Sequence, residues 1–118
     1  MKNVKIGALT YTIERTEDPI ILNNKLCSGM IDYSTLTIKI DSKLDEQVQN
    51  EVLIHEITHG IIMDRNLILE DEEMIVEEIC KGLHQLIVNN FDKEKLYKIY
   101  FNNDGELDDI EEVIEKAF

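Results

Sequence analysis

The stretch LIHEITHG, at residues 53–60, is the most informative part of this sequence. It holds two histidines four residues apart, and a glutamate directly follows the first of them. Residues four apart lie on one face of an α-helix, so His55 and His59 can reach a single ion. Two imidazoles and a carboxylate are a typical ligand set for zinc. The pattern His-Glu-x-x-His therefore predicts a zinc site on a helix, with Glu56 as the group that holds and deprotonates a zinc-bound water.

The residues on both sides of this motif predict a long helix over residues 44–64. Ser42 and Asp45 have the spacing of a capping box, with aspartate in place of the usual glutamate. Thr58 and Gly60 are small, which lets a substrate or a backbone segment approach. The apolar flanks that would bury such a helix are Leu53, Ile54, Ile57, Ile61 and Ile62. These flanks favour a metal-bearing helix over the alternative, in which the two histidines lie on a helix flank and bond only to carboxylates.

A third ligand is needed, because a catalytic zinc has three protein ligands and one open position. Asp71 suits the N-cap of a second long helix that ends near Asn90. The glutamates at the start of this helix are Glu72, Glu73, Glu77 and Glu78. Glu73 and Glu77 lie off one edge of its apolar arc and Glu78 lies off the other. Periodicity alone therefore does not choose between Glu77 and Glu78.

The N-terminal part of the chain is rich in β-branched and aromatic residues, which predicts strands. Residues 4–14 form a predicted strand that Gly7 can interrupt. Residues 15–24 predict a loop with one turn of helix, and residues 29–33 and 36–40 predict a hairpin. Together with the helices, this pattern predicts an α+β fold. We expect a small antiparallel sheet of about three strands, packed on the motif helix and on a second, ligand-bearing helix.

The C-terminal part of the chain carries weaker signals. Residues 91–103 fit either a strand or a helix, because apolar residues alternate within a segment that also has helical spacing. Residues 106–118 predict an acidic amphipathic helix. The chain shows no linker and no internal repeat, so residues 1–118 are predicted to form a single domain, in which residues 92–118 are an unassigned acidic extension.

The charge of the chain limits its partners. Twelve basic residues against 25 acidic ones give a net charge of −13. Nucleic acid and anionic membrane surfaces repel such a chain, so we expect neither as a partner, whereas a basic protein partner is compatible with it. Cys27 and Cys80 form no Cys-x-x-Cys pair, and the sequence shows no signal peptide and no apolar run long enough to cross a bilayer. The expected setting is reducing and cytoplasmic.

The segment HEITHGI, followed by EEMIVEEICKGLHQLI, resembles the small phage-encoded members of the ImmA/IrrE family of metallopeptidases. The order of elements is similar too: an N-terminal strand, a short hairpin ending in IKID, the His-Glu-x-x-His helix and an acidic helix. The resemblance covers approximately residues 1–91. It implies a minimal zincin-like fold of the gluzincin type, a cytoplasmic protein and Zn²⁺ as the cofactor.

The resemblance also implies a third ligand. In the family the second helix commonly reads Glu-x-x-Ala followed by Asp or Asn, and residues 77–81 (EEICK) fall on that frame. This makes Glu77 the expected metal ligand, with His55 and His59, and leaves Glu78 outside the site. Lys81 stands where Asn or Asp is usual, and in related gluzincins that residue accepts a hydrogen bond from a metal-binding histidine. Lysine cannot accept one, so the orientation of the histidines must come from another residue.

The function that these features imply is zinc-dependent hydrolysis of a peptide bond. The resemblance implies an endopeptidase whose substrate is a regulatory protein, such as a phage or mobile-element transcriptional repressor. The alternative is a non-catalytic acidic binding module that uses the same scaffold to sequester a partner protein, and a closed structural zinc site is a third interpretation. Tyr33 is a candidate oxyanion contact and His84 a candidate proton donor, although a packed structural role is the simpler interpretation of each. Cys80 is interpreted as an inert core thiol.

Overall fold

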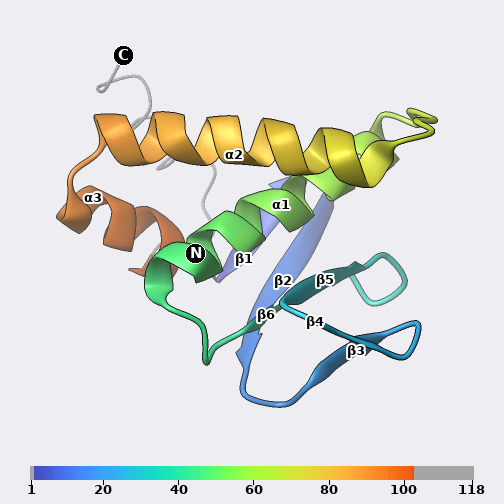
Figure 1. Ribbon diagram of the computed structural model, residues 1–118, viewed down its shortest axis with the longest axis horizontal. Coiled ribbons are helices and arrows are strands. Elements are labelled where there is room, and N and C mark those ends of the chain that lie inside the picture. Colours follow the sequence, from blue (N-terminus) through green and yellow to red (C-terminus); the bar gives the residue numbers. More distant parts are fainter. Residues whose placement is uncertain (1, 103–118) are drawn as a thin grey trace.

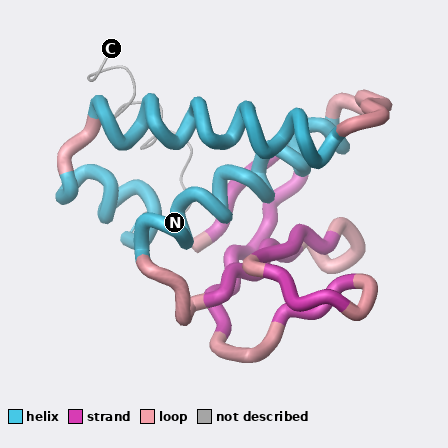
Figure 2. The backbone as a smooth tube through the Cα atoms, in the orientation of Figure 1, coloured by secondary structure: helices cyan, strands magenta, loops and turns pink. Residues whose placement is uncertain are grey.

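A four-stranded mixed sheet and two long helices make up most of the fold (Figure 1, Figure 2). The computed structural model describes residues 2–102. The strands are β1 (Asn3–Ile6), β2 (Leu9–Thr16), β3 (Ile20–Leu22), β4 (Lys25–Cys27), β5 (Gly29–Asp32) and β6 (Thr37–Asp41). The helices are α1 (Glu46–Asp64), α2 (Glu72–Asn90) and the short α3 (Lys93–Tyr97), which continues as a π-helical turn (Lys98–Asn102). These elements form an α+β fold, as the sequence predicts.

The main sheet has the strand order β1-β2-β6-β5 and differs from the predicted sheet. β1 and β2 form an antiparallel hairpin that turns at Gly7, where φ is 61°. β5 and β6 form the predicted antiparallel hairpin. β2 and β6, however, run parallel, so the expectation of an antiparallel sheet of three strands is wrong. The reason lies in the connection, because residues 17–36 are long enough to carry the chain back to the same end of the sheet.

A second, two-stranded sheet occupies the segment that was expected to be a loop with a helical turn. β3 and β4 pair antiparallel, with Ile21 opposite Leu26. Asn23 and Asn24 connect them, and both have positive φ angles, 53° and 63°. Two-residue hairpin loops prefer this conformation, and asparagine tolerates it well. Each strand is only three residues long, which is too short for alternation to reveal it in the sequence.

The two long helices lie close to their predicted positions. α1 is capped by Asp45, whose side chain accepts a hydrogen bond from the backbone nitrogen of Gln47, so the cap is Asp45 rather than Ser42. Asp71 precedes α2 as expected but makes no capping hydrogen bond with its side chain. In the ambiguous segment after α2, Phe91 and Asp92 are extended and residues 93–102 are helical. The amphipathic helix predicted at residues 106–118 lies outside the described residues.

α1 lies between the main sheet and α2 (Figure 1). One side of α1 contacts β1, β5 and β6, where Leu53 is fully buried together with Ile38 and Ile40. Gly60 permits a close approach, because a Cβ at this position would lie 2.7 Å from Cδ1 of Ile6. Another side of α1 faces α2 and a cleft that runs along β5.

Candidate metal centre

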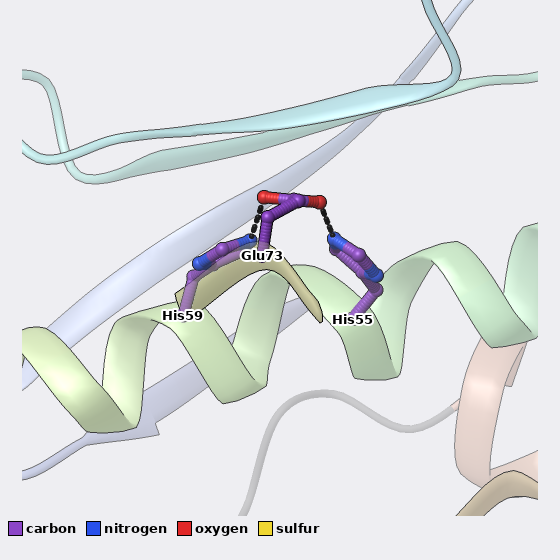
Figure 3. A group of neighbouring side chains, drawn as sticks. All are labelled: His55, His59 and Glu73. Atoms are coloured by element: carbon purple, nitrogen blue, oxygen red, sulfur yellow. Dashed lines mark hydrogen bonds and ion pairs between the residues drawn. The ribbon is translucent and has the colours of Figure 1, made fainter. Parts of the chain in front are cut away.

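Two histidines extend from one face of α1 into the cleft (Figure 3). Four residues make slightly more than one helical turn, so the rings of His55 and His59 are neighbours, with their centroids 5.0 Å apart. Both side chains are largely buried, at 17% and 13% of full exposure. Since the opposite side of α1 packs on the sheet, both rings extend from a firmly held helix.

Glu73, in the first turn of α2, reaches both rings. Its Oε1 lies 2.8 Å from Nε2 of His55, and its Oε2 lies 3.0 Å from Nε2 of His59 (Figure 3). One ligand atom from each of these three residues lies within 4.8 Å of the other two. The three side chains could therefore hold one metal ion between them.

The remaining ring nitrogens also face carboxylates. Nδ1 of His59 lies 2.7 Å from Oε2 of Glu72, and Nδ1 of His55 lies 3.6 Å from Oε2 of Glu77. The ammonium group of Lys81 lies 3.5 Å from the other oxygen of Glu77. A carboxylate that accepts the Nδ1 proton leaves Nε2 free to bind a metal and fixes the ring orientation. Glu72 is thus an acceptor at hydrogen-bond distance from His59, while Glu77 lies at ion-pair distance from His55; Lys81 itself cannot accept a hydrogen bond.

The spacing of these atoms fits a zinc ion. Zinc binds imidazole nitrogen and carboxylate oxygen at about 2.0–2.1 Å in a tetrahedron, whose neighbouring ligand atoms lie roughly 3.3 Å apart. Oε1 and Oε2 of Glu73 lie 2.8 and 3.0 Å from the Nε2 atoms of His55 and His59, so one of these oxygens has to move into the position of a ligand that both imidazoles share. The side chain of Glu73 is 73% exposed, so little packing opposes this movement. Two imidazole nitrogens and one carboxylate also match the donor set of zinc sites with an open fourth position.

Glu77, the ligand implied by the resemblance, lies at the edge of this cluster rather than between the two rings. Its carboxylate is near Nδ1 of His55, whereas Glu73 is near Nε2 of both histidines. Glu78 is exposed and does not line the cleft. The helical periodicity had placed Glu73 and Glu77 on the same edge of the helix. Helical periodicity does not predict the point along α2 at which this helix crosses α1. The observed crossing point places Glu73 between the two rings.

Glu56 lies in the same cleft and is largely buried, at 8% exposure. Burial raises the pKa of its carboxyl group, and the charge of Glu73 acts in the same direction, while His55 and His59 act against them. Glu56 is therefore a carboxyl group with a raised pKa in the same cleft as the candidate metal ligands.

Three other side chains were candidates for the site. Tyr33 lines the cleft and donates a hydrogen bond of 3.3 Å to the carbonyl oxygen of His59; burial, with nearby negative charge, raises its pKa to about 12. His84 does not line the cleft, and its buried Nδ1 has no hydrogen-bond partner within residues 2–102. Cys80 is buried, donates to the carbonyl oxygen of Glu51, and has a pKa that burial raises to about 11, as expected of an inert thiol.

The cleft beside the cluster has a volume of about 850 Å³. Its walls come from α1, the first turns of α2, the segment from β4 into β5, and the β3–β4 hairpin. This volume is in the range of clefts that bind ligands. The candidate metal centre therefore opens onto a space that can hold a bound molecule.

Comparisons with known proteins do not assign the chain to a family. No family model matches the chain, and neither the curated proteins nor the solved structures include a match. Within the described part of the chain, no helix has the length and apolar character needed to cross a membrane.

Proposed function

We propose that this protein is a zinc-dependent endopeptidase. The proposal rests on one observation: His55, His59 and Glu73 converge on one point, in the same cleft as Glu56. Structural zinc sites are usually closed by four protein ligands, whereas this cluster has three among the described residues and opens onto the cleft. The arrangement favours a catalytic zinc over a purely structural one.

The side chains around the cluster have distinct roles in this proposal. Zinc held here would polarise a peptide carbonyl and lower the pKa of a water molecule. Glu56, which lines the same cleft, would accept a proton from that water and return it to the leaving amine. The hydroxyl of Tyr33 stays protonated at neutral pH, and it would donate to the oxygen of the attacked carbonyl after releasing its 3.3 Å hydrogen bond to the carbonyl oxygen of His59. Glu72 would orient the ring of His59 through its hydrogen bond, and Glu77 would attract the ring of His55 from 3.6 Å.

The substrate class comes from the resemblance rather than from the site. Residues 1–91 resemble ImmA/IrrE metallopeptidases, so the proposed substrate is a cytoplasmic regulatory protein such as a transcriptional repressor. In this proposal a segment of such a protein enters the cleft in an extended form, alongside β5 and the α1 helix, which both line it.

The acidic binding module remains the second candidate, and one feature favours it. The net charge of −13 suits electrostatic attraction of a basic partner without any chemistry. Co-expression with a candidate repressor separates the two functions. An endopeptidase leaves fragments of the repressor, whereas a binding module leaves an intact complex that high salt weakens.

The first experiment is a measurement of metal content after purification without chelator or nickel resin. We expect about one zinc per chain, since one three-ligand site is proposed. His59→Ala should lose the zinc, while His84→Ala, which removes a histidine outside the cluster, should keep it. A wild-type protein that holds no zinc, even after zinc is added, would exclude the metallopeptidase.

A second experiment separates catalysis from metal binding. Glu56→Gln should keep the zinc and lose peptide hydrolysis, because the amide cannot accept the proton from water. Hydrolysis is read by mass spectrometry on a mixture of peptides. If Glu56→Gln hydrolysed peptides at the wild-type rate, Glu56 would not be the general base.

A further inference from the structure

The cleft has walls of different chemical character. The α1 wall presents a line of side chains one turn apart, of which Glu51, His55 and His59 are successive members. The opposite wall is the β3–β4 hairpin, which presents Leu22 and Lys25. A molecule bound in the cleft therefore meets a carboxylate on the helix and an aliphatic and a cationic side chain on the hairpin.

The hairpin turns a defined face toward the cleft. Leu22 and Lys25 are directly opposite each other in the β3–β4 pair, and side chains of opposite residues lie on the same face. Ile21 and Leu26, the next pair along, point the other way and are exposed. The hairpin lies next to β5, so its inner face closes the cleft on the side away from α2.

Glu51 is the cleft carboxylate that the metal centre leaves unused. Glu56, Glu73 and Glu77 all have roles at the cluster, whereas the carboxylate of Glu51 forms no ion pair within residues 2–102. Its backbone carbonyl accepts a hydrogen bond from Cys80, which anchors this turn of α1 to α2. Glu51 is half-buried and lines the cleft.

The position of Glu51 suits a basic side chain of a bound peptide. Four residues of helix span about 6 Å, so Glu51 lies about that far along α1 from His55. An extended peptide advances about 3.3 Å per residue, so side chains two residues apart on one face are separated by a similar length. A cation directly at the metal would be repelled, and one displaced by a helical turn is repelled less, because the energy between two charges falls as their distance grows. Lys25 on the hairpin disfavours a cation on the opposite wall.

We infer that Glu51 forms a subsite for a lysine or arginine side chain, located within two residues of the bond to be cleaved. The inference rests on the proposed endopeptidase function and names the substrate class, a peptide with a basic residue beside the scissile bond. Glu51 contacts the substrate in this subsite and takes no part in the proton transfer.

The test measures binding, so that it does not depend on hydrolysis. The protein is the zinc-loaded Glu56→Gln variant, and the probes are two mixtures of fluorescein-labelled decapeptides made of random uncharged residues. One mixture carries a single central lysine and the other carries norleucine, which has a similar length without the charge. Fluorescence anisotropy should show the lysine mixture binding about three- to fivefold more tightly at low salt, because the pair is partly solvated.

Matched variants test whether Glu51 causes the preference for lysine. Adding Glu51→Gln should remove the preference for lysine, while adding Glu78→Gln, which makes the same charge change outside the cleft, should leave it intact. Glu51→Lys should reverse the preference toward a mixture with a central glutamate. Circular dichroism spectra and urea unfolding check that each variant folds.

Two results would overturn the inference: an equal affinity for both mixtures, or a lysine preference that survives in Glu51→Gln. A failure of the proposed endopeptidase function would give a different result from a failure of the Glu51 subsite. In that case the zinc-loaded wild type cleaves neither mixture, while the binding preference and its dependence on Glu51 can still be present.

Discussion

α1 and α2 are both 19 residues long, but the fold holds them in different ways. α1 lies against the sheet, and its buried residues are Gln49, Asn50, Leu53, Glu56, Thr58, Gly60 and Ile62. The buried residues of α2 are Val76 and Cys80. The candidate ligands follow this difference, because both histidines of α1 are largely buried while Glu73 of α2 is 73% exposed. The site thus combines two firmly held imidazoles with a carboxylate that can adjust its position.

The largest expected effect tests the difference in packing between the two helices. Leu53→Ala removes a fully buried side chain from α1 and should lower the free energy of unfolding by about 2–5 kcal/mol. Ile79→Ala removes a side chain from α2 that is 48% exposed and should cost less than about 1 kcal/mol. Urea unfolding of the zinc-free proteins measures both. Equal losses would mean that α2 is as tightly packed as α1.

The next effect concerns the two carboxylates of α2 at the cluster. Glu73→Ala removes a carboxylate whose two oxygens each lie near one of the Nε2 atoms, and it should weaken zinc binding more than about 100-fold. Glu77→Ala removes a partner of Nδ1 and should weaken zinc binding by about tenfold. Competition with a chromogenic chelator measures both affinities. The opposite order would make Glu77 the third ligand, as the family resemblance implies.

A smaller effect tests whether Glu72 supplies the hydrogen-bond acceptor that Lys81 cannot provide. Glu72→Gln keeps the shape of the side chain but weakens the acceptor 2.7 Å from Nδ1 of His59, and zinc affinity should fall by about tenfold. Glu78→Gln is the control, since Glu78 is exposed on the same helix outside the cleft. The free energy of unfolding of the zinc-free protein should be the same in both variants. A loss of stability in Glu72→Gln without a loss of zinc affinity would assign Glu72 a structural role.

The smallest effect compares the glycines of the two helices. A Cβ at Gly82 of α2 meets no atom within 4 Å, so Gly82→Ala should stabilise the protein by about 0.5–1 kcal/mol through helix propensity. A Cβ at Gly60 of α1 would lie 2.7 Å from Ile6 and 3.1 Å from Ile31, so Gly60→Ala gains the same propensity but crowds the core. The midpoint temperature of thermal unfolding should therefore rise for Gly82→Ala and not for Gly60→Ala. A stabilising Gly60→Ala would show that α1 can shift on the sheet.

Local patterns predicted the elements of this fold well where they are long. The helices at residues 46–64 and 72–90 follow from apolar periodicity and from cap residues, and the β5–β6 hairpin follows from alternation. The β3–β4 hairpin was missed because three residues per strand show no alternation. The parallel pairing of β2 with β6 was also missed, since strand direction depends on how the intervening segment returns the chain.

The sequence by itself determined that His55, Glu56 and His59 share a helix, because their spacing alone puts the two imidazoles on one face. It also determined the acidic charge of the chain. Only the tertiary structure decided that Glu73 lies between the two rings while Glu72 and Glu77 face their outer nitrogens. The physical reason is that helical periodicity specifies the angle of a side chain around its own axis. The point at which α2 crosses α1 depends instead on how both helices pack in the folded protein.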